Sequence, residues 1–192
     1  MKNTYLLIII LLLSCSTVKS QNVKIEIKTE LGSIIAEVYA DKAPITTNNF
    51  LKYINNNKYK GASFYRVVRM DNQPKNNIKI EVIQGGLGMD IEDSPYVPIA
   101  HETTDVTGIL HTDGVLSMAR DEPGTASSEF FITIGNQPSL DFGGLRNKDG
   151  QGFATFGKVI EGMDIVKKIQ HSKDNEQMLL NKVEILSITI LE

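Results

Sequence analysis

The chain has 192 residues, of which 41% are hydrophobic and 22% are charged. This composition is that of an ordinary globular protein, and the length suits one domain with a sizeable core. The formal net charge of −3 gives no electrostatic reason to expect a nucleic-acid partner.

The first residues carry the pattern of an export signal. Lys2 supplies a positive charge and residues 5–13 form an unbroken apolar run, shorter than the roughly 20 residues that a membrane-spanning helix needs. The run ends in LLSC, which resembles the lipobox of bacterial lipoproteins. This resemblance implies a signal peptide over residues 1–15 that ends at a lipidated Cys15. The alternative is a plain secretory signal cut near Ser20.

Either signal implies that the folded part is exported to the cell envelope. Cys15 is the only cysteine, so the chain forms no internal disulfide. Residues 16–22 are expected to be a polar tether, and residues 23–192 the folded domain. The domain would then contact the membrane through its lipid anchor only, on a side of the envelope that the sequence does not specify.

Alternating apolar and polar residues predict strands at the start of the domain, over residues 23–28 and 34–38. Asp41 is expected to cap a helix that carries Pro44 in its first turn. That helix is expected to end in the Asn-rich stretch 55–57.

A hairpin is expected next, with a polar turn between its strands. Phe64, Arg66 and Val68 alternate on one side of its first strand, and residues 78–84 alternate in the same way on the return strand. Each strand therefore places one polar group, Arg66 and then Gln84, among apolar neighbours. A half-buried Arg is uncommon unless it is paired or used.

The rest of the chain is predicted to be mostly strand and loop, with an irregular segment over residues 88–108. Strands are expected over residues 114–119, 129–134, 153–159 and 183–191, and a second helix over residues 162–169. The alternation in the last strand slips near Ile185 and Leu186, as it does at a β-bulge. About seven or eight strands with two helices favour a mainly β fold, a closed or nearly closed antiparallel barrel, over a parallel α/β sheet.

Two kinds of chemistry are not expected. His101, His111 and His171 lack metal-ligand spacing, so we expect no metal site. No Ser lies in the sequence context of a nucleophile elbow. The cation of Arg66 and the amide of Gln84 remain, beside apolar positions. That pair suits binding and polarising a neutral polar group better than bond cleavage.

Three segments together resemble the cyclophilin-type peptidyl-prolyl cis-trans isomerases: FYRVV with VIQGG, then GVLSMARDEPGTASSEFFITIG, then FATFGKVIEGMDIVKKI. The resemblance extends over nearly all of residues 23–192. It implies an eight-stranded closed antiparallel barrel capped by two helices, and isomerase activity on proline-containing polypeptides. We expect a monomer that uses no cofactor and binds no nucleic acid.

The resemblance also implies the site residues. Arg66 corresponds to the catalytic cation, and Gln84 to the amide that orients this cation and the substrate backbone. The other implied substrate-binding positions are Val82 and Leu140 in the wall of a proline pocket, Phe131 at its floor, Ala119 and Arg120 along the peptide groove, and Glu129 and Phe153 where the family usually has Gln and His. From residue type alone, the three apolar pocket positions also suit an ordinary core. Phe130 is expected to be core, because strand alternation points it away from its neighbour.

The link between Val68 and Val82 is longer than the usual link in the family. We expect this segment to shape access to the groove, with Arg69, Lys75 and Lys79 at its tip.

Other departures keep alternatives open. Glu81 stands where the family usually has Phe, and the position of a Trp found in many members falls near Ser139. Arg66 could instead be a structural residue paired with Glu129 or Glu81, and Gln84 could satisfy backbone groups at a strand end. The alternative function is therefore a catalytically weak proline-peptide binding module or chaperone.

Overall fold

The structure is a computed structural model, and it describes residues 22–88 and 97–191. The expected signal peptide, its Cys15 and the tether up to residue 21 lie outside the described residues. Among the helices of the described part, none is long and apolar enough to cross a membrane.

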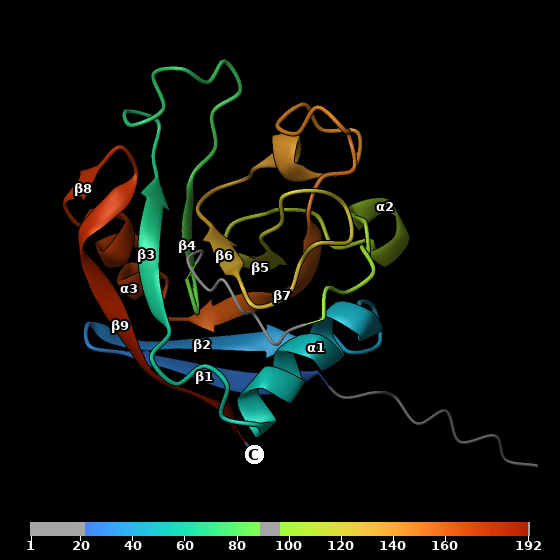
Figure 1. Ribbon diagram of the computed structural model, residues 1–192. Helices are drawn as coiled ribbons and strands as arrows, with labels where there is room; N and C mark the ends of the chain where they lie inside the picture. Colours follow the sequence, from blue (N-terminus) through green and yellow to red (C-terminus); the bar gives the residue numbers. More distant parts are fainter. Residues whose placement is uncertain (1–21, 89–96, 192) are drawn as a thin grey trace, which may run out of the picture.

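The described residues form one antiparallel sheet of nine strands, and eight of these close into a barrel (Figure 1). The order around the barrel is β1, β2, β7, β5, β6, β4, β3, β9, and β9 pairs with β1 to close the ring. The ninth strand, β8, has two residues and pairs with β9. The strand bounds are β1 Val23–Thr29, β2 Gly32–Val38, β3 Ser63–Val68, β4 Val82–Gly86, β5 Val115–Met118, β6 Phe130–Thr133, β7 Ala154–Glu161, β8 Asp174–Asn175 and β9 Met178–Leu191. The expected closed barrel is confirmed.

The closing strand explains the slip in the sequence pattern. Lys28 pairs with Ser187 but Thr29 pairs with Ile185, so Leu186 is an extra residue in β9. This is the β-bulge that the sequence indicated. The strand begins earlier than expected, at Met178, because its first residues pair with β8 and β3.

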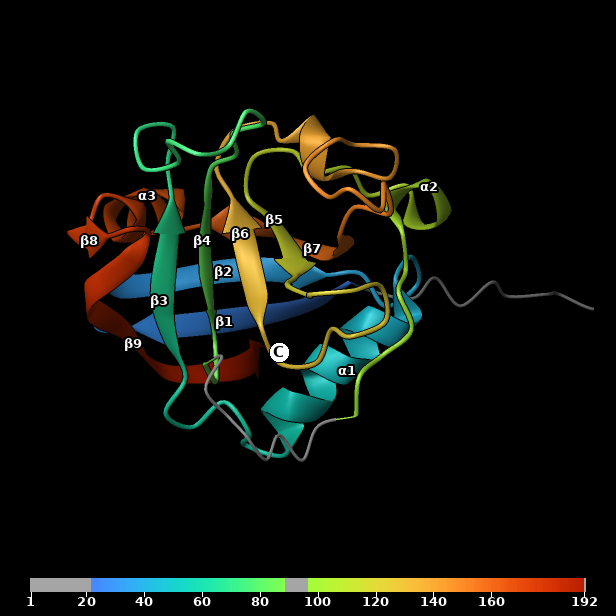
Figure 2. The same ribbon diagram turned by 45° about the horizontal axis from the view of Figure 1, so that its top comes forward.

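Two helices cover opposite sides of the barrel, α1 (Pro44–Asn55) and α3 (Met163–Gln170) (Figures 1 and 2). Both were expected, and each contributes fully buried apolar side chains to the barrel interior. Phe50 comes from α1, and Val166 and Ile169 come from α3.

The N-terminus of α1 is capped from a distance, and the predicted cap at Asp41 is wrong. Ala43 occupies the N-cap position and makes no side-chain cap hydrogen bond. The carboxylate of Glu102 instead accepts hydrogen bonds from the backbone N–H groups of Ile45 (3.1 Å) and Thr46 (2.7 Å). A carboxylate suits this place because the first N–H groups of a helix have no partner within the helix.

The segment expected to be irregular also contains a short helix, α2 (Thr104–Thr107). Gly108 ends it with φ 68°, a left-handed conformation that glycine adopts at little cost. Further along, a 3-10 turn over Pro138–Leu140 follows β6.

Aromatic rings fill the centre of the barrel, and we call the buried apolar side chains around them the inner cluster. Its five central rings are Phe50, Tyr59, Phe64, Phe130 and Phe156. The Phe130 ring packs edge-on against Phe50 at 5.4 Å and against Phe64 at 5.8 Å between ring centroids. Such pairs stabilise a core beyond the area that they bury.

The segment between β3 and β4, residues 69–81, is a loop, so the expected return strand begins only at Val82. One buried side chain holds this loop together. The Gln73 amide donates to the carbonyls of Arg69 (2.8 Å) and Ile80 (2.7 Å), and its oxygen accepts from the Ile80 N–H (3.3 Å). The side chain thus replaces the strand pairing that the sequence pattern had suggested.

The expected arrangement of three cations at the loop tip is wrong for Arg69. It directly follows β3, and its guanidinium contacts Asp174 and donates to the Gln170 carbonyl (2.8 Å). Lys75 is exposed. Lys79 donates to a backbone carbonyl of its own loop.

Candidate active site

Strand pairing places the central site residues in one row across the barrel wall. Arg66 of β3 pairs with Gln84 of β4, Gln84 pairs with Phe131 of β6, and Phe131 pairs with Ser117 of β5. Figure 2 shows these four strands side by side. Because paired residues point to the same face of a sheet, the cation, the amide and the aromatic ring lie together.

A β-bulge in β3 brings Arg66 to this outer face. The sequence pattern put Phe64 and Arg66 on the same side, which is wrong, because the pairing register shifts between them. Phe64 is fully buried in the inner cluster, whereas Arg66 is partly exposed. A bulge re-aims a side chain in this way without ending the strand.

The apolar half of the site is a second hydrophobic cluster outside the barrel wall, which we call the outer cluster. Its buried members are Val68, Ile80, Val82, Phe131 and Leu140, with Ala119 and Phe153 packed against them. The Phe153 ring stands edge-on to Phe131, with 5.3 Å between centroids and 88° between planes. The outer cluster therefore brings together five of the predicted pocket and groove positions: Val82, Ala119, Phe131, Leu140 and Phe153.

The floor ring of the outer cluster rests on a buried histidine. His111 stacks on Phe131 with 5.9 Å between centroids and 9° between planes. Its Nδ1 lies 2.7 Å from the Asp141 carboxylate and its Nε2 lies 3.0 Å from Ser117 Oγ. Ser117 is fully buried, so this Ser-His-Asp series supports the floor and exposes no nucleophile. Burial lowers the pKa of His111 even though Asp141 raises it.

The polar half of the site is centred on the Arg66 guanidinium. Nη1 donates to Gln84 Oε1 (2.8 Å), while Nε (3.2 Å) and Nη2 (2.6 Å) donate to Gln177 Oε1. No salt bridge to Glu129 or Glu81 forms, so the alternative of a structural ion pair is not what the structure has. Burial lowers the pKa of Arg66, but a guanidinium stays charged in proteins.

Gln84 acts as a bridge between side chains. Its oxygen accepts from Arg66, and its Nε2 lies 2.9 Å from the hydroxyl oxygen of Tyr65. The side chain therefore does not serve backbone groups at the strand end, which was the alternative interpretation. The two contacts fix which end of the amide faces the guanidinium.

Glu129 lies behind the site and is fully engaged there. The Tyr65 hydroxyl donates to its Oε2 (2.6 Å), and the backbone N–H groups of Leu87 (2.8 Å) and Gly88 (3.1 Å) donate to its Oε1. Burial and this carboxylate raise the pKa of Tyr65, so its hydroxyl stays protonated. A Cβ at Gly86 would lie 2.5 Å from Glu129 Oε1, which explains the glycine there. Glu129 therefore positions the Tyr65 hydroxyl, which in turn contacts the Gln84 amide.

Arg120 borders the groove with its side chain turned inward. Its guanidinium pairs with both oxygens of Asp149 (2.9 Å each) and donates to the Gly152 carbonyl (2.6 and 2.9 Å). Its Cζ lies 5.2 Å from the centroid of the Phe153 ring. The hydrogen bonds from Arg120 hold the pKa of Asp149 below its usual range. Arg120 thus fixes the loop that carries Phe153.

Arg146 joins the two loops at the rim of the site. Its Nη1 donates to Gln73 Oε1 (3.1 Å) and to the Ile78 carbonyl (2.5 Å). Burial and the neighbouring Arg66 guanidinium lower the pKa of Arg146. The 69–81 loop is therefore tied to the loop that carries Arg146.

The sequence-predicted residues thus fall into three groups. Arg66, Gln84, Val82, Phe131, Leu140, Phe153 and Ala119 come together, Arg120 borders them and Glu129 lies behind them. Sequence reasoning missed Tyr65, His111 and Gln177. In residues 22–88 and 97–191, no three His, Cys, Asp or Glu side chains are grouped to hold a metal ion.

An eight-stranded closed barrel with a cation–amide pair beside an apolar cluster is the arrangement that the resemblance to the peptidyl-prolyl isomerases implied. Residues 23–190 match the family described as "Cyclophilin type peptidyl-prolyl cis-trans isomerase/CLD". The chain belongs to this family, and its enzymatic activity is peptidyl-prolyl cis-trans isomerisation.

Two bacterial relatives illustrate the match. A peptidyl-prolyl cis-trans isomerase of Acinetobacter baylyi is 40% identical over 152 residues, which cover 77% of this chain and 72% of the relative. Peptidyl-prolyl cis-trans isomerase B of Escherichia coli is 35% identical over 146 residues, which cover 74% of this chain and 80% of the relative.

Among solved structures, a cyclophilin-type isomerase of Cryptosporidium parvum superposes with a TM-score of 0.71 and 22% identity. The superposition covers 90% of this chain and 99% of that one. This likeness supports the fold. A second structure of that protein, determined in the presence of the dipeptide Ala-Pro, has a TM-score of 0.70.

Proposed function

We propose that the protein accelerates isomerisation of X–Pro bonds in polypeptides that fold in the cell envelope, with Arg66 as its catalytic residue. The observation that carries this proposal is the cross-strand row Arg66, Gln84, Phe131. It sets a guanidinium with unused N–H donors beside the apolar outer cluster, which would hold the proline ring.

The physical task needs no bond cleavage. Amide resonance opposes rotation with a barrier of about 18–20 kcal/mol, so unaided isomerisation takes tens to hundreds of seconds. In the proposed mechanism the outer cluster holds the proline ring, and an Arg66 N–H donates to the prolyl nitrogen as it becomes pyramidal. Only an interaction that is stronger in the twisted state than in the ground state lowers the barrier. Gln84 keeps the guanidinium at the angle that this requires.

The proposed substrates are proline-containing polypeptides. The Ala-Pro dipeptide named for the Cryptosporidium parvum structure supports this choice, because it contains the shortest unit with an X–Pro bond. No cofactor enters the proposed mechanism, since the Arg66 guanidinium supplies its donor.

The proposed location rests on the N-terminal sequence. Cys15 would be lipidated, or the signal would be cut near Ser20, and the protein would act as a monomer in the envelope. In Figure 1 the described chain begins beside α1, away from the 69–81 loop. A tether at that place would leave the groove open to polypeptides. Mass spectrometry of the mature N-terminus tests the anchor: a diacylated Cys15 supports it, and an unmodified end near Ser20 contradicts it.

A protease-coupled proline-peptide assay on wild type and Arg66→Ala tests the catalytic role. Removing one positioned donor for transition-state charge typically lowers kcat about a hundredfold or more. Lys75→Ala removes an exposed cation from the neighbouring loop and should leave kcat/KM unchanged. If wild type and Arg66→Ala are equally slow, the protein is instead a proline-peptide binding module or chaperone.

A further inference from the structure

The Arg66 guanidinium donates hydrogen bonds to two side chains, Gln84 and Gln177. Only Gln84 belongs to the site that the sequence indicated. Gln84 Oε1 accepts from Nη1 at 2.8 Å. Gln177 Oε1 accepts from Nε at 3.2 Å and from Nη2 at 2.6 Å. A guanidinium has five N–H groups, so these three contacts leave one free N–H on each terminal nitrogen.

Gln177 reaches Arg66 from an unusual backbone position. Glu176 and Gln177 join β8 to β9 as a two-residue turn, with φ 48° and 76°. Turns with two positive φ values strongly favour Asn-Gly or Asp-Gly, because a side chain at positive φ is strained. Of the two residues, Glu176 is exposed, whereas the side chain of Gln177 contacts Arg66.

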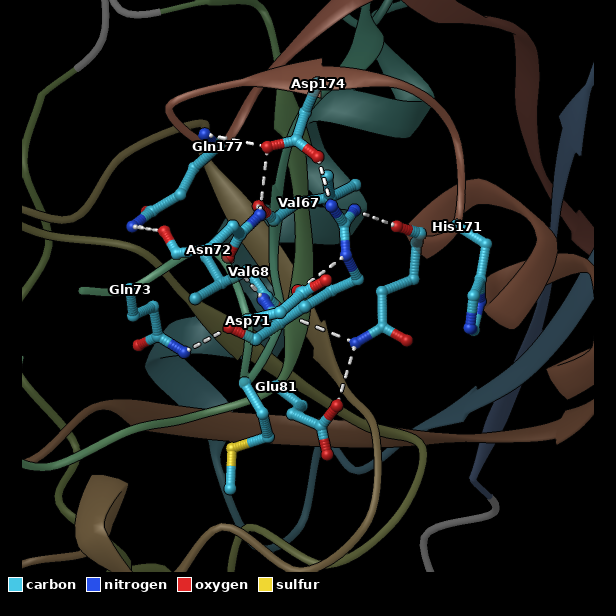
Figure 3. Close-up of polar contacts among 12 residues, drawn as sticks. Val67, Val68, Asp71, Asn72, Gln73, Glu81, His171, Asp174 and Gln177 are labelled. Carbon is cyan, nitrogen blue, oxygen red and sulfur yellow. Dashed lines mark hydrogen bonds and ion pairs between the residues drawn. The ribbon is translucent and has the colours of Figure 1, made fainter.

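Other contacts lock the Gln177 side chain in place. Its backbone N–H donates to Asp174 Oδ2 (3.0 Å), and its side-chain Nε2 donates to the Asn72 carbonyl (3.2 Å). Figure 3 shows Gln177 and Asn72 converging on Asp174. The Gln177 amide therefore has a fixed direction, with its oxygen toward Arg66 and its nitrogen toward the 69–81 loop.

Asp174 connects the turn to the long loop. Its side chain is 5% exposed, forms an ion pair with Arg69, and accepts from Asn72 Nδ2 (3.0 Å). Burial alone would raise the pKa of Asp174, but the hydrogen bonds from Arg69 and Asn72 lower it, so the carboxylate stays charged. The long loop thus supports the turn that presents Gln177.

The amide chemistry of the Gln177 side chain also fits a positioning role. Both side chains that accept from Arg66 in the described part of the chain are neutral amides, and no carboxylate forms an ion pair with it. A carboxylate would fix the guanidinium but also neutralise its charge. An amide oxygen orients it and leaves the charge available for a developing lone pair.

We propose that Gln177 is a positioning residue for Arg66, fixing the guanidinium so that its two free N–H groups face the prolyl bond. This inference rests on the proposed catalytic role of Arg66. The 69–81 loop, through Asn72 and Arg69, holds the turn in the geometry that Gln177 needs.

The test compares Gln177→Gly with Glu176→Gly. Both substitutions relieve positive φ in the same turn, so neither should lower the melting temperature. Glu176 is exposed and serves as the matched control, with kcat/KM unchanged. Gln177→Gly should lower kcat about tenfold, the scale of one lost charge-assisted hydrogen bond, with KM little changed. An unchanged or increased kcat in Gln177→Gly overturns the proposal.

A double variant shows whether Gln177 acts through Arg66. In an Arg66→Ala background, measured by exchange NMR at high enzyme concentration, adding Gln177→Gly should change the rate less than twofold. A further tenfold loss overturns the proposal, because Gln177 would then act on another group. If Arg66→Ala alone leaves kcat unchanged, it is the proposed function that fails. If only Arg66→Ala lowers kcat, the positioning role alone fails.

Discussion

Phe130 and Phe131 are adjacent in β6 and almost equally buried, at 0% and 4% exposure, yet they lie on opposite faces of the barrel wall. Phe130 packs among the rings of the inner cluster, including Phe50 and Phe64. Phe131 lies in the outer cluster, stacked on His111 and one strand from an amide–guanidinium pair. Burial alone therefore does not separate a core residue from the proposed pocket residue. The two residues are distinguished by the polar groups at the border of the outer cluster.

The largest effect is expected in the inner cluster. Phe130→Ala would leave a cavity among close-packed rings, and such changes cost about 3–5 kcal/mol of folding free energy. Urea unfolding measures this loss. Phe130→Leu keeps most of the volume and should cost much less. A loss below about 1 kcal/mol for the Ala variant would contradict the comparison.

Phe131→Ala should affect catalysis more than folding. Removing the floor of the proposed pocket leaves the proline ring without its main contact, so KM should rise and kcat/KM should fall about tenfold or more, equivalent to at least about 1.4 kcal/mol. The peptide assay and a melting curve on the same sample measure both quantities. Comparable catalytic losses per folded molecule in Phe130→Ala would remove the distinction between the two clusters.

The His111 ring, which stacks on Phe131, should make the free energy of unfolding depend on pH. Burial holds the pKa of His111 below its unfolded value of about 6.5, so the folded state keeps this ring neutral. The contribution of His111 to the free energy of unfolding is complete above about pH 6.5. It is lost as the pH falls below this value, because the unfolded chain binds the proton more readily than the folded state does. The slope is at most about 1.4 kcal/mol per pH unit.

Urea unfolding between about pH 7.5 and about pH 5.5 measures this slope. His111→Gln should reduce it, whereas His171→Gln, at an exposed position, should not. An identical slope in wild type and His111→Gln would show that other groups are responsible.

The smallest effect is expected at the rim. Arg146→Ala removes the hydrogen bonds from its Nη1 to Gln73 and to the Ile78 carbonyl, and with them the link between two loops. A few-fold rise in KM with unchanged kcat is expected, since a net hydrogen bond contributes about 1 kcal/mol. Steady-state kinetics with Lys148→Ala as the control tests this. A drop in kcat instead would assign Arg146 a role beside Arg66.

The sequence predicted the features that depend on local pattern or on family motifs. Alternation indicated a β-bulge near Ile185 and Leu186, and the VIQGG motif placed Gln84 beside Arg66. The bulge in β3 could not be predicted, because counting every second residue assumes a regular strand. That assumption wrongly placed Phe64 and passed over Tyr65.

Long-range polar partners were the main omission. Gln177 lies in the polar stretch KDNEQM, which indicates a turn and nothing about the turn's partner. Glu102 likewise caps a helix through the N–H of Ile45, which lies 57 residues earlier in the chain. His111 was considered only as a metal ligand, because no spacing of residues in the sequence indicates that its ring stacks on Phe131. Such contacts depend on the tertiary fold, and a single sequence contains no direct signal for them.

The pairing of β1 with β9 has a consequence for engineering. Lys24 lies opposite Leu191, so the two ends of the folded domain are neighbours. A short linker could join them, and new termini could open within the exposed stretch 74–77 of the long loop. Such a circular permutant should keep the barrel, and fusion partners could then be attached next to the groove rather than behind it.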